Sequence, residues 1–167
     1  MTKKKSPVIS FEDFSFQYRA QKKPTLTGIN LNIYPGEKVL IAGPSGSGKS
    51  TLAGCINGLN PFSNPGESTG KLIVDGVDAM QSSIFELSAH VGTVLQDPDG
   101  QFIGLTVGED IAFALENRCT PQDKMHEITK HAAELVGIEH HLDSKANKLS
   151  QGNEEDRRDA DAQVEAA

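Results

Sequence analysis

The sequence is poor in the features that mark secreted and membrane-spanning proteins. It contains no tryptophan and only two cysteines, Cys55 and Cys119, which lie far apart and outside any CxxC spacing. Two such cysteines favour reduced thiols in a cytoplasmic protein over a disulfide framework. No apolar run approaches the roughly 20 residues that a transmembrane helix needs. The basic start, MTKKKSPVIS, lacks an apolar h-region, so we expect no signal peptide.

An excess of positive charge is also absent. The 167 residues include 16 Lys and Arg against 23 Asp and Glu, which gives a formal net charge of -7. This balance favours solubility and argues against a generic nucleic-acid-binding surface. The length suits about one domain with one large core.

Apolar residues near the amino terminus alternate with polar ones. In the segments 8–18 and 26–34 they occupy every second position, and a polar turn separates the two segments. This pattern predicts two half-buried antiparallel strands. The continuous apolar runs at 39–42 and 91–96 predict strands that are buried on both faces. The stretch KLIVDGVDA predicts a further strand with a turn at Asp75 and Gly76.

Helical periodicity follows the glycine-rich stretch after residue 42. The spacing i, i+3, i+4, i+7 predicts a helix that ends near Asn60-Pro61, with the apolar positions Leu52, Cys55, Ile56 and Leu59. A second helix is predicted over 107–117.

A third helix is predicted after residue 119. Thr120 suits the N-cap position, Pro121 suits N1, and Gly137 marks the end. The apolar spacing predicts a buried stripe of Met125, Ile128, Ala132 and Leu135.

The stretch GPSGSGKS at 43–50 fits the pattern G-x-x-x-x-G-K-[ST] between an apolar run and an amphipathic helix. Its glycines let successive N–H groups turn inward as an anion nest, and the helix N-terminus adds a positive dipole end. Lys49 supplies a charge for the β- and γ-phosphates, the Ser50 hydroxyl can ligate Mg²⁺, and Thr51 can contact the α-phosphate side. The alternative is a glycine-rich turn that carries a lysine by chance. That alternative does not explain why an apolar run precedes the stretch and an amphipathic helix follows it. We therefore predict a site for ATP and Mg²⁺ formed by Gly43, Pro44, Ser45, Gly46, Ser47, Gly48, Lys49, Ser50 and Thr51.

Four motifs, in order along the chain, resemble those of the ATP-binding-cassette (ABC) ATPases. Within that family they most resemble the ATPases of the energy-coupling-factor importers, which take up vitamins and metal ions. The motifs are FSFQY, GPSGSGKST, VGTVLQDPDGQFIGLTVGEDIAFALEN and KLSQGN. The resemblance implies that Tyr18 stacks on adenine and that Gln96, in the glutamine loop, reaches Mg²⁺ or the attacking water. It also implies that a signature motif, with Leu149, Ser150 and Gly152, closes over a nucleotide held by a second subunit.

The resemblance implies an α/β fold, with a phosphate-loop core, an antiparallel β subdomain and a helical subdomain. It covers residues 1–152, which correspond to the amino-terminal portion of the family's domain. The expected parts are an antiparallel start at 1–38, a phosphate-loop core at 39–100, a helical subdomain at 101–148, a degenerate signature at 149–152 and a charged tail at 153–167.

The sequence departs from the family's pattern at its end. Gln151 and Asn153 replace the glycine and glutamine of the signature, and the only apolar side chains of 154–167 are alanines and Val164. The family's Asp-Glu strand and its downstream histidine are not present, so no catalytic residue is identifiable. The acidic residues near the glutamine loop are interpreted as loop or helix-start carboxylates. They are Asp97, Asp99, Glu109 and Asp110.

Two functions stay open. In the first, the chain is the ATPase subunit of an importer. It then works as a dimer and docks an integral-membrane subunit in the groove beside the glutamine loop, at the inner face of the cell membrane. In the second, it is a nucleotide-binding module, a fragment or an engineered piece, with little or no hydrolysis. Neither function involves nucleic acid.

Overall fold

The computed structural model describes residues 6–94 and 103–145. The chain divides into two compact units, Met1–Val91 and Gly92–Ala167. The α/β fold class is confirmed, whereas the finer subdivision of the domain stays a prediction. Within the described residues, no helix is both long enough and apolar enough to cross a membrane.

The first unit contains a four-stranded antiparallel sheet in the order β2-β1-β3-β4. Its strands are β1 (Ile9–Tyr18), β2 (Leu26–Ile33), β3 (Gly66–Val74) and β4 (Val77–Asp78). The antiparallel pair predicted at the amino terminus is therefore confirmed. The predicted turn is confirmed as well, because Asp75 and Gly76 join β3 to β4 with φ of 47° and 84°.

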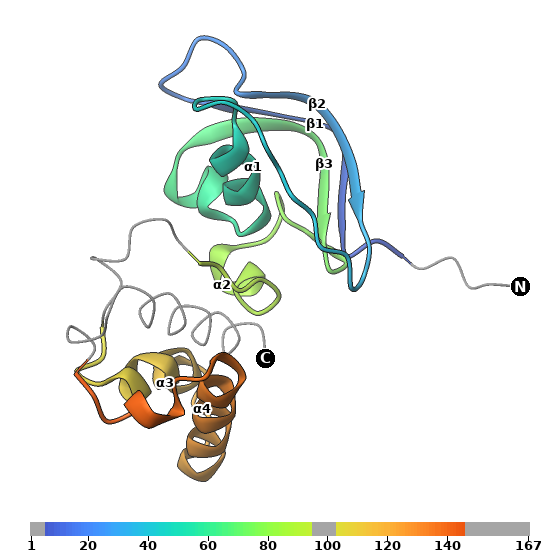
Figure 1. The fold of residues 1–167 in the computed structure, drawn as a ribbon. Coiled ribbons are helices and arrows are strands. Elements are labelled where there is room, and N and C mark those ends of the chain that lie inside the picture. Colours follow the sequence, from blue (N-terminus) through green and yellow to red (C-terminus); the bar gives the residue numbers. More distant parts are fainter. Residues whose placement is uncertain (1–5, 95–102, 146–167) are drawn as a thin grey trace, which may run out of the picture. The chain divides into compact units, whose positions relative to one another are not determined.

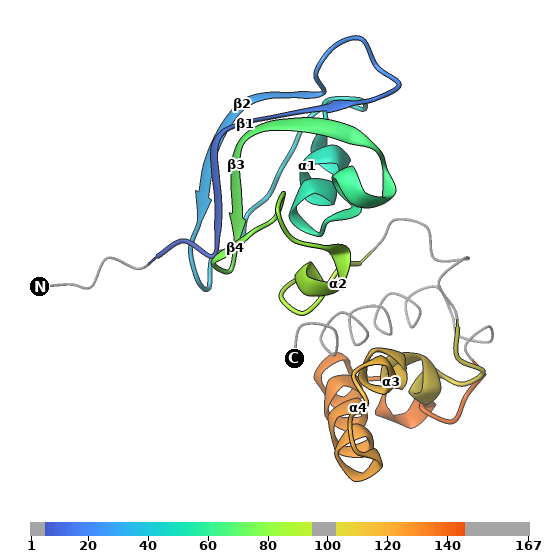
Figure 2. The ribbon, with the colours of Figure 1, turned by 180° about the vertical axis from the view of Figure 1, so that it is seen from behind.

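Helix α1 (Lys49–Ile56) lies against one face of the sheet, which curves around it (Figure 1 and Figure 2). A short helical turn, Leu59–Ser63, and helix α2 (Ile84–Leu87) complete this unit. The predicted helix after the glycine-rich stretch is thus confirmed, but its predicted end is wrong. The helix ends at Ile56, because Gly58 has a left-handed φ of 80°, and Leu59 belongs to the separate turn that follows. The core that the helix and the sheet share consists of Phe11, Phe14, Phe16, Leu26, Leu52, Cys55, Leu72, Val74, Ala79 and Leu87.

Strand β1 contains a β-bulge. Between the register pairs Glu12–Lys71 and Ser15–Thr69, two residues of β1 oppose the single residue Gly70 of β3. The extra residue shifts the alternation of side chains by one position.

The bulge decides which β1 side chains face the core. Phe11 and Phe14 are three residues apart, a spacing that strict alternation would place on opposite faces. Both are nevertheless buried, with exposed fractions of 1% and 0%, and so is Phe16. Tyr18 is the next residue on this face, and it packs against the core at the end of the strand.

Two strand predictions are wrong. The runs 39–42 and 91–94 have no strand structure, and Leu40 is 90% exposed. A strand buried on both faces needs hydrogen-bonded neighbours and layers that cover it. The residues that the structure describes supply no ladder partner to either run. Residues 95 and 96 of the second prediction lie outside the described part.

The second unit is helical. Helix α3 (Val107–Asn117) confirms the prediction for that segment, and α4 (Gln122–Val136) follows, with a 3₁₀ turn at Glu139–His141. Thr106 and Glu109 form a capping box at the start of α3. The core of this unit consists of Val107, Ile111, Leu115, Ala132, Ala133 and Ile138.

The ends of α4 match the prediction only in part. Gly137 is the C-cap, as predicted, with φ of 78°. The N-cap, however, is Pro121 and not Thr120. Pro121 has ψ of 140°, an extended value, so the helix begins one residue later than predicted.

The buried stripe of α4 is also corrected at one position. Met125, Ile128 and Ala132 pack in the core, but Leu135 is 61% exposed. The buried positions follow the i+4 spacing from Thr129 to Ala133. Leu135 therefore falls outside the face that packs on α3.

Gly70→Ala tests the bulge. Gly70 has φ of +80°, and an added Cβ would meet the carbonyl group of Asp13, so the bulge would have to move. We expect the free energy of unfolding in urea to fall by roughly 2–3 kcal/mol.

Gly76→Ala is the matched control. Gly76 also has a positive φ, +84°, but no atom lies within 4 Å of its added Cβ. The free energy of unfolding of Gly76→Ala should therefore fall by only about 1 kcal/mol, which is the cost of holding alanine in a left-handed backbone conformation. Equal losses in the two variants would contradict a specific role of Gly70.

Candidate functional site

The loop 43–48 leads from the exposed apolar run into helix α1. Gly46 and Gly48 have φ of 78° and 93°, values that favour glycine. The Ser47 N–H donates to the Pro44 carbonyl at 3.2 Å. A Cβ added at Gly43 would lie 2.8 Å from Ser47 Oγ. The loop is therefore a tight backbone turn in which Gly46 and Gly48 are needed for conformation, whereas a side chain at Gly43 would require the Ser47 hydroxyl to move.

The loop ends at a helix N-terminus that no side chain caps. Gly48 is the N-cap of α1, and the first turn contains no acidic residue. By contrast, Ser83 caps α2 and Thr106 caps α3. Since the first N–H groups of a helix have no intrahelical acceptor, the start of α1 presents donors and a positive dipole end. This arrangement suits an anion such as phosphate.

Lys49 places a positive charge over the loop. Its Nζ donates to the carbonyl oxygens of Gly43 at 2.8 Å and Pro44 at 2.9 Å. Ser50, the next residue, is exposed at the start of α1. An ammonium group and a hydroxyl thus lie beside the uncapped helix end.

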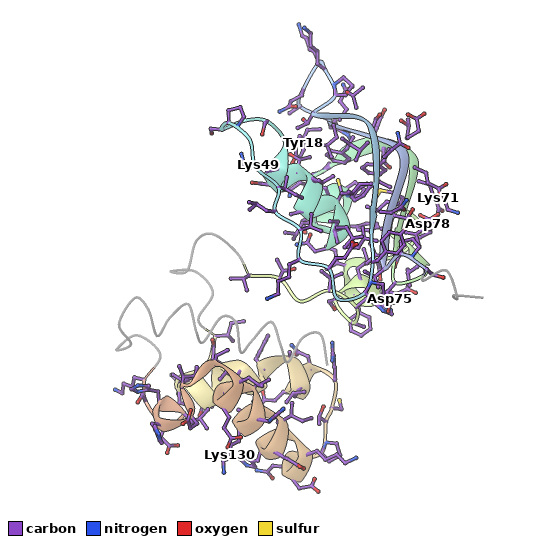
Figure 3. The ribbon with its side chains drawn as sticks, turned by 45° about the vertical axis from the view of Figure 1, so that its right-hand side comes forward. Tyr18, Lys49, Lys71, Asp75, Asp78 and Lys130 are labelled. Atoms are coloured by element: carbon purple, nitrogen blue, oxygen red, sulfur yellow. The ribbon has the colours of Figure 1, made fainter. Side chains whose placement is uncertain are left out.

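Tyr18 joins this site from strand β1. Its hydroxyl oxygen lies 3.0 Å from Thr51 Oγ1, and its ring makes an edge contact with Phe16 at a centroid distance of 5.0 Å. Figure 3 shows Tyr18 and Lys49 at the same end of α1. The tertiary structure therefore brings together two predicted site residues that are 31 positions apart in the sequence.

Asn60, which no sequence motif predicts as a site residue, contacts both Tyr18 and Thr51. It is 1% exposed, and its Nδ2 donates to the Thr51 carbonyl at 3.1 Å and to Tyr18 Oη at 3.3 Å. Its Oδ1 accepts from Asn64 Nδ2 at 3.0 Å. The sequence indicated only that a helix ends near this residue, and no motif or periodicity marks its role.

Cys55 lies on the buried side of α1. Burial raises the pKa of its thiol to about 12, and a hydrogen bond with the Asn60 side chain partly opposes this shift. The thiol is therefore neutral at physiological pH. Cys119, in the second unit, is free and exposed.

The acidic residues at the start of α3 accept hydrogen bonds from backbone N–H groups. Asp110 Oδ1 accepts from the N–H groups of Ile103 and Gly104, both at 2.8 Å, and Glu109 Oε2 accepts from the Leu105 N–H at 2.9 Å. Their interpretation as helix-start carboxylates is confirmed.

Several predicted site residues lie outside the described part of the chain. They are Gln96, Leu149, Ser150 and Gly152, and the acidic residues Asp97 and Asp99, interpreted as loop carboxylates, lie outside it as well. The glutamine loop and the signature motif therefore stay predictions.

Comparison with known proteins identifies relatives of this chain. The model of the family described as "ABC transporter" matches residues 26–158. A candidate ABC transporter ATP-binding protein of Bacillus thuringiensis is 55% identical over 149 residues, and one of Clostridium perfringens is 57% identical over 148. Each alignment covers 89% of this chain but 26% of the relative. The chain thus spans about a quarter of the length of these relatives.

A solved structure is similar as well. CbiO1 from Clostridium perfringens, described as part of the ABC transporter complex CbiONQ, matches with a TM-score of 0.81 at 30% sequence identity. The match covers 96% of this chain and 62% of the CbiO1 chain.

The two thiols should differ sharply in reactivity. At pH 8, a thiol reagent should modify Cys119 rapidly, because that residue is exposed, and leave Cys55 unmodified in the folded chain. Raising the pH to 9 should not expose Cys55 to reaction, since its thiol stays protonated until the pH nears about 12. Cys119→Ser is the control. A rapid phase that persists in this variant would contradict the burial of Cys55.

Proposed function

Because the chain belongs to the ABC transporter family, we propose that it binds ATP with Mg²⁺ through the loop 43–50 and serves as an ATP-binding subunit of a transporter. One observation carries this proposal: the glycine-rich loop, the Lys49 ammonium and the uncapped start of α1 converge on one place. Backbone donors, a mobile charge and a helix dipole together match a polyphosphate.

Each residue has a distinct part in the proposed complex. Lys49 exchanges its bonds to the Gly43 and Pro44 carbonyls for the β- and γ-phosphate oxygens, which bind an ammonium more strongly because they carry charge. Thr51 contacts the α-phosphate side with its hydroxyl. Tyr18 stacks on the adenine, since an aromatic ring packs well on any flat base.

The proposed Mg²⁺ ion accompanies the ATP. The Ser50 hydroxyl is exposed at the first turn of α1, and hydroxyl and phosphate oxygens are the hard ligands that Mg²⁺ prefers. When bound, the ion would neutralise charge on the β- and γ-phosphates. We assign Gln96 as a second protein group directed at the ion or at the water, on the basis of the motif in which it lies.

We further propose that the transporter is an importer of a vitamin or a metal ion. CbiO1 is part of a transporter complex, and this chain shares its fold at 30% identity. The longer protein would dock an integral-membrane subunit beside Gln96. It would pair with a second ATPase subunit through the segment 149–152. This assembly places it at the inner face of the cell membrane.

The second candidate function is ATP binding with little or no hydrolysis by these 167 residues. Hydrolysis needs a group that positions the attacking water. The helix-start carboxylates Glu109 and Asp110 are engaged with backbone N–H groups, so they do not supply that group. Binding, by contrast, needs only the loop, Lys49 and Tyr18.

Lys49→Ala tests the phosphate site. Removing the ammonium deletes its charge-assisted bonds to the phosphates, so calorimetry should show ATP affinity reduced by roughly 100-fold. Lys71→Ala is the matched control, because it makes the same charge change on an exposed residue of β3 far from Lys49 (Figure 3). Equal affinity in Lys49→Ala and the unmodified chain would overturn the assignment.

Binding and turnover should separate on the same purified chain. We expect saturable ATP binding together with Mg²⁺-dependent phosphate release far below ordinary enzyme rates of roughly 1 per second. A Lys49→Ala preparation measures the background. Turnover near 1 per second that disappears in Lys49→Ala would refute the second candidate and establish hydrolysis by this chain.

A further inference from the structure

The buried side chain of Asn60 lies between strand β1 and helix α1 and makes hydrogen bonds to several polar groups. Its exposed fraction is 1%, and its amide group contacts Tyr18, Thr51 and Asn64. A buried amide is costly unless its donors and acceptor are satisfied. Here both sides of the amide have partners, so the group is held in one orientation.

The orientation of the amide follows from its partners. The Thr51 carbonyl can only accept, so the atom 3.1 Å from it must be the Asn60 nitrogen. The same nitrogen then donates to Tyr18 Oη. Asn60 Oδ1 faces Asn64 Nδ2, which donates to it.

The Tyr18 hydroxyl has a second partner besides Asn60. Tyr18 Oη accepts from the Asn60 amide and also lies 3.0 Å from Thr51 Oγ1, in a hydrogen bond in which either hydroxyl can donate. These two contacts fix the position of the Tyr18 hydroxyl. The described residues include no other side-chain partner of Tyr18 Oη than Thr51 and Asn60.

Helix α1 leaves space for the amide. A Cβ added at Gly54 would lie 2.5 Å from Asn60 Nδ2 and 3.1 Å from its Cγ. Any larger residue at this helix position would push the amide away from Tyr18. The glycine therefore serves the placement of Asn60, at a helical position where glycine is otherwise unfavourable.

We propose that Asn60 is a positioning residue for nucleotide binding: it holds the Tyr18 ring at the end of β1 in the place where the ring receives the adenine base. This inference rests on the proposed function. Base stacking on an aromatic ring depends on the position of that ring, and the hydroxyl is the only polar handle by which the protein can hold it. Asn60 itself touches no nucleotide and acts through Tyr18.

Asn60→Ala, measured with two ligands, tests the proposal. ATP carries the base, whereas inorganic triphosphate carries only the phosphates. We expect ATP affinity to fall by roughly five- to tenfold. Triphosphate affinity should change by less than about twofold, because the phosphate loop keeps its own contacts.

A double-mutant cycle with Tyr18→Phe tests whether Asn60→Ala lowers ATP affinity through Tyr18. Phenylalanine keeps the ring but has no hydroxyl for Asn60 to hold. In that background, Asn60→Ala should reduce ATP affinity by less than about a further twofold. Asn32→Ala, on an exposed residue of β2, is the control for the same change and should leave both affinities unaltered.

Gly54→Ala is a second test that keeps the Asn60 side chain. The added methyl group should displace the Asn60 amide and lower the ratio of ATP affinity to triphosphate affinity, as Asn60→Ala does. This variant replaces Asn60→Ala as the test if Asn60→Ala fails to fold.

An unchanged ratio of the two affinities would overturn the positioning role while leaving the proposed function intact. If the unmodified chain binds neither ligand, the proposed function fails and this inference fails with it.

Discussion

The packing of helix α1 against the phenylalanine-lined face of β1 is the contact on which the whole site depends. It brings the start of α1, and with it Lys49, beside the end of β1, where Tyr18 lies. The contact exists because the bulge opposite Gly70 keeps Phe11, Phe14 and Phe16 on one face. Without that extra residue, strict alternation would direct part of this apolar surface away from the helix and remove much of the driving force for packing.

The site itself combines groups that are left available with groups that are tightly held. The N–H groups at the start of α1 have no side-chain cap, so they can serve an anion. Tyr18 and Thr51, by contrast, are tied to each other and to the buried Asn60. Flexible charge, in Lys49, therefore lies next to a rigid aromatic ring. This division suits a ligand with a charged tail and a flat base.

Local signals predicted the elements that depend on local chemistry. The loop 43–50 was predicted because its glycines, lysine and serine lie at fixed spacing within a few residues. The turn at Asp75 and Gly76 was predicted for the same reason. The run 39–42 was predicted wrongly as a buried strand, since a strand needs ladder partners that the described residues do not provide. Leu135 was misplaced because apolar spacing alone does not define which face of α4 meets α3.

The sequence by itself determined the family, the helix that follows the glycine-rich loop and the antiparallel start, since each depends on residue types at fixed spacing. Only the tertiary structure decided that Phe11 and Phe14 share one face and that Tyr18 meets Thr51. It alone revealed Asn60, whose contact with Tyr18 spans 42 positions. The physical reason is that a register shift and a long-range hydrogen bond leave no periodic pattern in the sequence; they arise when separate segments pack together.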